Sequence, residues 1–248
     1  MNNLLSVENL SKSFGALRAS DGIGFDVGEG ETHAVIGPNG AGKTTLISQL
    51  AGNLRPDAGS IRFAGEDITR LSAPRRSRKG LARSFQITSV FPEFTALDNV
   101  ALAVQAQAGH SFRFWRPAQQ DSRLTDPASR VLSEVGLTER QHILAANLSH
   151  GEHRQLEVAM ALATRPRLLL LDEPMAGMGI EESQRMIALL GALKRRLTII
   201  LVEHDMDAVF RLADRISVLV YGRIIATDTP EKIRANEEVR RAYLGEDA

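Results

Sequence analysis

A glycine-rich stretch near the N-terminus constrains this chain more than any other feature. It fits the pattern G-x-x-x-x-G-K-[ST] of a phosphate-binding loop and reads Gly37-Pro38-Asn39-Gly40-Ala41-Gly42-Lys43-Thr44-Thr45. The apolar run from His33 to Ile36 precedes it and is typical of a buried strand, and a helical spacing of Leu46, Ile47, Leu50 and Leu54 follows it. The stretch therefore lies between a strand and the start of a helix, a context that an ordinary glycine-rich turn does not need.

The residue types of this loop suit a nucleoside triphosphate. Glycines let the backbone turn tightly, so that its N–H groups come close to phosphate oxygens. The start of the following helix adds unpaired N–H donors and a partial positive charge. Lys43 is expected to reach the β- and γ-phosphates, and the hydroxyl of Thr44 is expected to hold Mg²⁺.

The composition narrows the classes of function. The chain has 248 residues, of which 43% are hydrophobic, so it can bury a sizeable core. Its thirty basic and thirty acidic residues balance, so we expect no nucleic-acid partner. It has no cysteine, which excludes disulfides and thiolate metal sites and fits a reducing compartment. We expect no secretory signal, and the apolar runs are too short to span a bilayer, so any membrane role must come through a partner.

Short apolar segments alternate with helical patterns along the chain. The expected strands are Leu4 to Leu10, Ile23 to Val27, His33 to Ile36, Ser60 to Phe63, Leu81 to Phe85, Leu168 to Leu171, Leu197 to Val202, Ile216 to Val220 and Arg223 to Ala226. The expected helices follow the loop, run from Thr95 toward Gln107, from Pro127 to Val135, after Ser149, from Glu181 to Lys194, and from Pro230 and Glu237. This alternation predicts an α/β fold with a mostly parallel sheet and helices on its faces.

Two segments admit more than one interpretation. Leu71 to Lys79 carries four basic residues, and the neutral overall charge favours a solvated helix face over a binding patch. Gly109 to Pro117 alternates aromatic and arginine side chains and holds the only tryptophan. It could stack on bases, lie at a membrane surface or pack against its own domain, and we favour the last because such aromatics are more often partly buried.

A pair of acidic residues gives a second nucleotide signal. Asp172 and Glu173 directly follow the apolar strand Leu168 to Leu171. An aspartate at the end of a buried strand beside a phosphate loop can hold Mg²⁺ through water. The adjacent Glu173 can accept a proton from an attacking water. The alternative is a strand that simply ends in charges before Pro174, which the long-range pairing with a phosphate loop disfavours.

Further short motifs complete a pattern in chain order. They are Phe14, Gln86 in Arg83-Ser84-Phe85-Gln86, Leu148-Ser149-His150-Gly151-Glu152, and His204 in Val202-Glu203-His204-Asp205-Met206. Each has an ordinary structural interpretation when taken alone, and Ser149 with Glu152 also fits a helix capping box. Together with the loop and the acidic pair, they make the chain resemble an ATP-binding-cassette ATPase from end to end.

The resemblance implies a fold and a role for each motif. It implies a P-loop NTPase core with an antiparallel β subdomain, at about 1–86 and 165–248, and a helical subdomain at about 87–164 with an extra excursion at 109–126. Phe14 falls where the family stacks an aromatic on adenine. Gln86 matches the glutamine loop that senses Mg²⁺ and the attacking water, and His204 matches the switch histidine that contacts the γ-phosphate. Ser149 and Gly151 match the family signature, which contacts the γ-phosphate of the ATP bound to a second chain.

Three residues depart from the family pattern. His150 replaces the first glycine of the signature, Glu152 replaces its glutamine, and Gly179 stands where an aspartate is usual. The first two place side chains near the expected dimer interface without removing Ser149 or Gly151. The third puts the usual cross-subunit contact of that aspartate in doubt.

Within the family, the chain most resembles ATPase subunits of branched-chain amino acid uptake systems and their urea and amide relatives. The supporting residues include the motifs above and the tail Val239-Arg240-Arg241-Ala242-Tyr243-Leu244-Gly245-Glu246. The resemblance implies a peripheral subunit at the cytoplasmic face of the inner membrane that hydrolyses ATP to ADP and phosphate. The implied partners are two permease subunits, a second ATPase subunit as homodimer or heterodimer, and indirectly a periplasmic solute-binding protein.

Other functions remain as alternatives at this point. The ATPase of lipopolysaccharide export has a similar tail but lacks so long an excursion. Soluble ATP-binding-cassette proteins usually carry two cassettes or a long coiled coil, and this chain has one cassette and no sustained heptads. A P-loop kinase or GTPase is disfavoured by the signature stretch and by His204.

Overall fold

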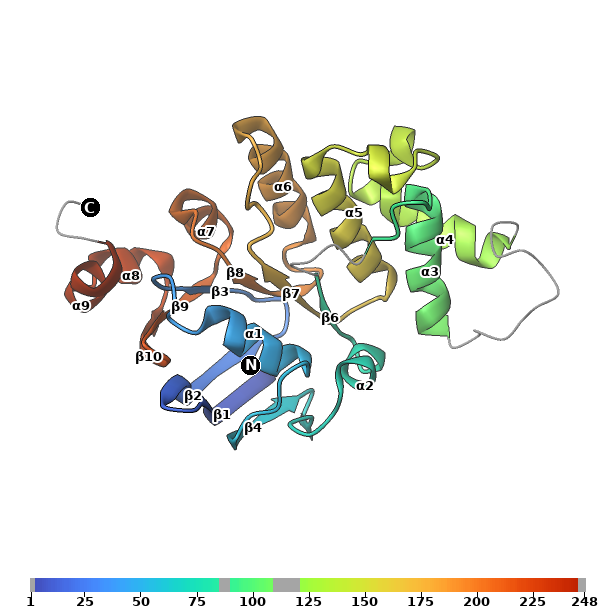
Figure 1. Ribbon diagram of the computed structural model, residues 1–248. Helices are drawn as coiled ribbons and strands as arrows, with labels where there is room; N and C mark the ends of the chain where they lie inside the picture. The colour runs from blue at the N-terminus through green and yellow to red at the C-terminus, as the bar shows by residue number, and fades with distance from the viewer. Residues whose placement is uncertain (1–2, 85–89, 109–120, 245–248) are drawn as a thin grey trace.

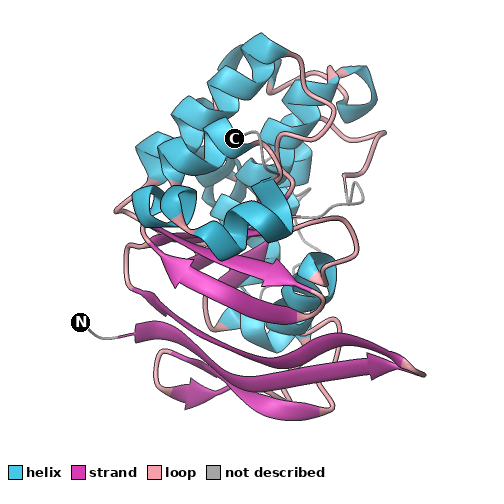
Figure 2. Ribbon diagram, turned by 90° about the vertical axis from the view of Figure 1, so that its left-hand side faces the viewer, coloured by secondary structure: helices cyan, strands magenta, loops and turns pink. Residues whose placement is uncertain are grey.

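Two sheets form the framework of the molecule. The computed structural model describes residues 3–84, 90–108 and 121–244. A six-stranded sheet has the order β10-β9-β3-β8-β7-β6, and a four-stranded antiparallel sheet has the order β2-β1-β4-β5 (Figures 1 and 2). The strands are β1 (Asn3–Phe14), β2 (Leu17–Gly28), β3 (Thr32–Ile36), β4 (Ala58–Phe63), β5 (Glu66–Asp67), β6 (Leu81–Arg83), β7 (Leu168–Asp172), β8 (Thr198–Val202), β9 (Arg215–Val220) and β10 (Arg223–Asp228). Of the strands described in the larger sheet, only β10 runs antiparallel to its neighbour.

Helices cover both faces of the larger sheet. They are α1 (Lys43–Ala51), α2 (Ala73–Arg78), α3 (Ala96–Ala108), α4 (Ser122–Glu134), α5 (His150–Ala163), α6 (Ile180–Leu193), α7 (Met206–Leu212), α8 (Pro230–Ala235) and α9 (Glu237–Val239). Figure 1 shows α1 between the two sheets, α6 and α7 on the opposite face, and α3 and α4 beside α5 at one end. Within the described ranges, no helix has the length and apolar character needed to cross a membrane.

The central strands are apolar on both faces because both faces are covered. In β7, Leu168 and Leu170 pack into the core that contains α1 and the antiparallel sheet. The alternate residues Leu169 and Leu171 pack into the core formed with α3, α4, α5 and α6. The period of two along an extended strand produces this division.

Most of the expected elements are confirmed, with differences at particular boundaries. The capping box at Thr95 is present, because Thr95 Oγ1 accepts from Asp98 N at 3.1 Å and Asp98 Oδ2 accepts from Thr95 N at 3.3 Å. Helix α4 begins at Ser122, so Pro127 lies inside it instead of at its start. The sequence pattern does not predict helix α7, because seven residues are too few to show a clear period. The expected strand end at Phe85 and the aromatic segment Gly109 to Pro117 lie outside the described residues.

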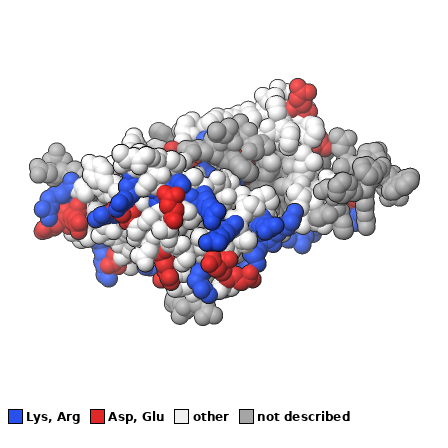
Figure 3. All heavy atoms as spheres, turned by 60° about the horizontal axis from the view of Figure 1, so that its bottom comes forward, with Lys and Arg blue, Asp and Glu red and all other residues white. Residues whose placement is uncertain are grey.

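The interpretation of Leu71 to Lys79 as a wholly solvated basic face is wrong for Arg76. This side chain is 1% exposed, and its guanidinium donates to Gln49 O and Leu50 O, both at 2.7 Å, at the last turn of α1. It also donates to Leu71 O and Thr69 O, each at 3.0 Å. Burial lowers its pKa to about 10. Elsewhere on this side of the molecule, Figure 3 shows Lys and Arg interspersed with Asp and Glu.

Candidate functional site

The phosphate loop joins the end of β3 to the start of α1, as the sequence predicts. Lys43 is the first residue of α1 and is 7% exposed. Its ammonium donates to Gly37 O at 2.7 Å and to Pro38 O at 3.0 Å. Burial lowers the pKa of Lys43, and the nearby charges of Glu173 and Asp172 oppose that effect. The loop thus folds around a cation that its own carbonyl groups hold.

Segments distant in sequence fix the shape of the loop. Gly42 has a φ of 106°, and a Cβ at this position would lie 2.3 Å from the carbonyl oxygen of Ala19 on β2. Gly222, in the turn between β9 and β10, donates its N–H to Ala41 O at 2.9 Å and accepts from Asp21 N at 2.8 Å. The loop is therefore wedged between β2 and the β9–β10 turn, where only glycine fits at position 42.

A cavity of about 480 Å³ opens over the loop. Its lining includes Asn39 to Thr45, Glu173 and two aromatic side chains, Phe14 and Tyr221. Phe14 is 50% exposed, and Lys12 Nζ lies 5.6 Å from the centre of its ring. Tyr221 is 87% exposed, and the sequence predicts its hairpin turn but not its place in this cavity. Exposed aromatic rings beside a phosphate loop suit a nucleobase, because every base offers a π-face.

Asp172 lies at the end of β7 with its side chain 1% exposed. Its Oδ2 accepts from Arg83 Nη2 at 2.9 Å, and its Oδ1 is buried without a hydrogen-bond partner among the described residues. Burial raises the pKa of Asp172, and the Arg83 guanidinium opposes this. An unpartnered buried carboxylate oxygen beside a phosphate loop fits a Mg²⁺ site. Within the described ranges, no group of three or more His, Asp or Glu residues could hold a metal by itself.

Glu173 and His204 lie beside each other at the same edge of the sheet. Glu173 has a φ of 50°, a strained value for a residue other than glycine, and donates its N–H to Val202 O at 2.8 Å. His204 Nδ1 lies 4.0 Å from Glu173 Oε1. The Glu173 side chain is 30% exposed and the His204 side chain is 59% exposed, so both remain accessible to water.

Glu203 organises the loops that carry this pair, although no sequence pattern singles it out. It is 0% exposed. Its carboxylate accepts from Met175 N at 3.0 Å, His204 N at 2.9 Å and Asp205 N at 3.3 Å. A buried carboxylate thus joins the turn after Glu173 to the turn that carries His204.

The structure places Ser149 and Gly151 away from the phosphate loop. They line a different cavity, of about 170 Å³, together with Glu182 and Arg185 of α6. Ser149 is the N-cap of α5: its Oγ accepts from Glu152 N at 3.2 Å, and its N–H donates to Glu152 Oε2 at 2.8 Å. The capping box is confirmed, and the serine presents its hydroxyl at an exposed helix N-terminus.

The departures from the family pattern make contacts within the chain. His150 Nε2 lies 3.0 Å from Ala176 O, and Glu152 Oε1 accepts from Arg140 Nε at 2.8 Å. Gly179 caps α6 without a side chain, and its N–H donates to Glu182 Oε2 at 3.3 Å. The carboxylate of Glu182 also covers Gly151, where a Cβ would lie 2.5 Å from Glu182 Oε1.

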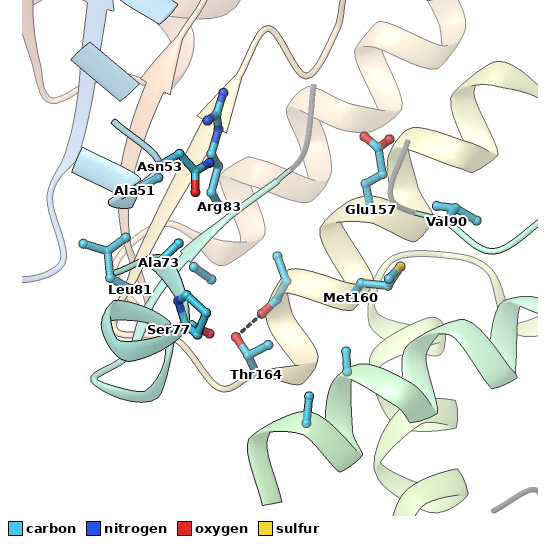
Figure 4. Close-up of a pocket in the computed structure, with 15 residues that line it drawn as sticks. Ala51, Asn53, Ala73, Ser77, Leu81, Arg83, Val90, Glu157, Met160 and Thr164 are labelled. Atoms are coloured by element: carbon cyan, nitrogen blue, oxygen red, sulfur yellow. Dashed lines mark hydrogen bonds between the residues drawn. The ribbon is translucent and has the colours of Figure 1, made fainter. Parts of the chain in front are cut away.

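A third cavity is apolar and lies between α2, α5 and the end of β6. Its volume is about 320 Å³. Figure 4 shows Ala73 and Ser77 on one side, Met160 and Thr164 on another, and Arg83 and Glu157 toward one end. Gln86, the remaining expected site residue, lies outside the described residues.

The family models and the relatives that match this chain all describe ATP-binding proteins of ABC transporters. Residues 20–176 match the family model described as ABC transporter, and residues 223–248 match that of the branched-chain amino acid ATP-binding cassette transporter. The chain is 40% identical over 250 residues to the high-affinity branched-chain amino acid transport ATP-binding protein BraF of Pseudomonas aeruginosa, covering 98% of each chain. It is 37% identical to LivG of Escherichia coli, with the same coverage.

Two further matches bear on function and fold. The lipopolysaccharide export system ATP-binding protein LptB of Haemophilus influenzae is more distant, at 31% identity and 98% coverage of each chain. A crystal structure of an ATP-binding cassette of an ABC transporter in its ADP conformation superposes with a TM-score of 0.87 at 28% identity, covering 99% of this chain and 100% of that one.

Proposed function

The chain belongs to the ABC transporter family of ATP-binding cassettes, and on that premise we propose that it powers uptake of branched-chain amino acids or related small solutes. It is an ATPase subunit, and the α/β fold expected of a P-loop NTPase is confirmed. The names of BraF and LivG and the match of residues 223–248 support the solute class. The lower identity to LptB makes lipopolysaccharide export the second candidate.

The observation that carries the ATPase assignment is the meeting of separate elements at one edge of the sheet. Lys43 of the loop, Asp172 at the end of β7, Glu173 directly after it, and His204 after β8 come together there. A carboxylate 4.0 Å from an imidazole, beside a phosphate loop, is suited to activate a water. The signature residues Ser149 and Gly151 line a separate cavity and not the one over the phosphate loop of the same chain.

We propose the following roles in hydrolysis. Phe14 and the loop residues 37–45 bind ATP, and Lys43 neutralises charge on the β- and γ-phosphates. Glu173 accepts a proton from the attacking water, and His204 contacts the γ-phosphate. Thr44 and Asp172, with Gln86, hold Mg²⁺, which neutralises phosphate charge when bound. Ser149 and Gly151 contact the γ-phosphate bound to a second copy or a related subunit.

The proposed assembly follows because each ATP would need the phosphate loop of one subunit and the signature residues of another. Two ATPase subunits pack head to tail with ATP between them, so ATP favours the closed dimer through contacts that the open form lacks. The region at about 87–164, including the excursion at 109–126, acts as a helical subdomain that faces two permease subunits. The apolar cavity beside Arg83, with Phe91 and Phe94 nearby in the chain, receives a permease helix. We propose that the assembly lies at the cytoplasmic face of the inner membrane, with a periplasmic solute-binding protein as an indirect partner.

Glu173→Gln tests the assignment of the base. The variant should bind ATP as the wild type does, because the phosphate loop is unchanged. It should lose steady hydrolysis by at least about a hundredfold, because the amide cannot accept the proton. Equilibrium binding and phosphate release measured on the same preparation separate the two effects, and Glu181→Gln, on the exposed first turn of α6, is the control. Turnover at the wild-type rate would remove Glu173 from this role.

The solute class needs a separate test. Deleting the gene should abolish uptake of labelled leucine and isoleucine by cells, and the wild-type gene should restore it where Glu173→Gln does not. Unchanged uptake together with lipopolysaccharide retained at the inner membrane would favour the second candidate.

A further inference from the structure

Arg83 connects two parts of the proposed site that are far apart in the sequence. It is the last residue of β6, next to β7 in the sheet. Its guanidinium donates from Nη2 to Asp172 Oδ2 at 2.9 Å and from Nη1 to Ser48 Oγ at 3.4 Å. The Arg83 and Asp172 side chains are 12% and 1% exposed, so this ion pair is largely screened from water.

The two carboxylate oxygens of Asp172 differ in their hydrogen bonding. Oδ2 is held by Arg83, whereas Oδ1 is buried and has no hydrogen-bond partner in the part of the chain that the structure describes. A carboxylate held through one oxygen cannot rotate freely, so the direction of the other oxygen is fixed. Removing one partner of a buried ion pair leaves a costly unpaired charge, and the carboxylate then rotates or becomes protonated.

The same side chain also borders the apolar cavity. Arg83 lines it together with residues of α2 and α5, among them Ser77 and Thr164. Figure 4 shows the Arg83 side chain extending away from Ser77 and Thr164, toward the end of the cavity where Asn53 lies. Arg83 therefore borders the proposed permease groove, while its guanidinium contacts Asp172, the proposed metal ligand.

We propose that Arg83 is a positioning residue that fixes Asp172 through Oδ2 so that Oδ1 is available to hydrated Mg²⁺. This inference rests on the proposed function, because it assumes that Asp172 serves the metal. It assigns Arg83 no contact with nucleotide. Binding of nucleotide without metal should therefore be independent of Arg83, whereas the gain from Mg²⁺ should depend on it.

The test uses the full chain and a fluorescent ADP analogue. Its dissociation constant is measured with EDTA and with excess Mg²⁺, and the constant in EDTA divided by the constant in Mg²⁺ reports how much Mg²⁺ tightens binding. We expect the neutral variants Arg83→Met and Arg83→Gln to lower this ratio about tenfold with the EDTA value unchanged. Arg83→Lys keeps a charge that can reach Asp172 and should restore the ratio to within about threefold of the wild type.

Two controls separate the possible outcomes. Arg78→Met removes an exposed arginine from the neighbouring helix α2 and should leave the ratio unchanged. Using two neutral variants guards against one that fails to fold, which thermal unfolding identifies. A wild-type ratio in a folded neutral variant would overturn the proposal, and so would a higher ratio, because it would mean that Arg83 competes with the metal. A wild-type chain that gains nothing from Mg²⁺ would instead count against the proposed function.

Discussion

The phosphate loop and the signature stretch, the two halves of the proposed ATP site, are stabilised in different ways. The loop is held by distant parts of the chain: Gly42 lies against Ala19 of β2, and Gly222 of the β9–β10 turn bonds to Ala41. The signature stretch is held partly by near neighbours, through the capping box of Ser149 and Glu152 and the ion pair of Glu152 with Arg140, and partly by the segment that leads into α6, where His150 meets Ala176 O.

This difference indicates that one chain can form the phosphate-loop half of the ATP site without a partner. The loop cavity already has the Lys43 cation, the Glu173 carboxylate and its aromatic walls within one copy. The signature presents an exposed helix N-terminus beside the carboxylate of Glu182. We therefore expect changes in the loop to affect nucleotide binding by one chain, and changes in the signature to leave that binding intact and to affect hydrolysis, which needs two chains.

Gly42→Ala should have the largest effect. Its Cβ would lie 2.3 Å from a backbone oxygen at a φ of 106°, so the loop must move. We expect a loss of about 3 kcal/mol in the free energy of unfolding and loss of ATP binding. Urea unfolding and nucleotide titration measure the two quantities.

Gly191→Ala is the matched control for this change. Gly191 lies in α6, and no atom of the described residues beyond its own helix neighbours comes within 4 Å of the position that a methyl group would take. The same substitution should therefore stabilise the chain by about 0.5–1 kcal/mol. Equal effects of the two variants would contradict the view that distant strands shape the loop.

Ser149→Ala should separate nucleotide binding from hydrolysis. Loss of the helix cap should cost about 1 kcal/mol of stability. Binding of ATP to a single chain should stay unchanged, while hydrolysis by the assembled transporter should fall at least about tenfold through loss of the γ-phosphate contact. Thr95→Ala removes the equivalent cap from α3 at similar cost and should leave hydrolysis intact. A parallel loss of activity in both variants would assign the effect to folding.

Glu182→Gln should have a smaller effect, and it should strengthen the association of two subunits instead of impairing it. Glu182 Oε1 lies 3.5 Å from Ser149 Oγ, where its negative charge would repel an incoming γ-phosphate. Removing the charge should tighten the ATP-dependent dimer about two- to fivefold. Sedimentation of the variant in a Glu173→Gln background measures this without turnover. Glu181→Gln changes the exposed neighbour and should have no effect, and a weaker dimer in Glu182→Gln would contradict the idea.

Local patterns predicted what depends on local sequence. The apolar runs found the buried strands, and serine or threonine followed by an acidic residue found the caps of α3 and α5. Contacts across the chain could not be predicted in this way. Arg83 and Asp172 are separated by 89 positions, and no pattern in either segment identifies the other. Arg76 lies among other basic residues and differs from them only because the end of α1 lies beside it.

The buried guanidinium of Arg76 has a mechanical consequence. It joins the last turn of α1 to α2 through carbonyl groups of Gln49, Leu50 and Leu71. Helix α1 carries Lys43 at its other end, and α2 forms a wall of the apolar groove. Arg76 thus ties the wall of the groove to the helix that carries Lys43, and we expect a displacement of α2 to reach the phosphate loop through these hydrogen bonds.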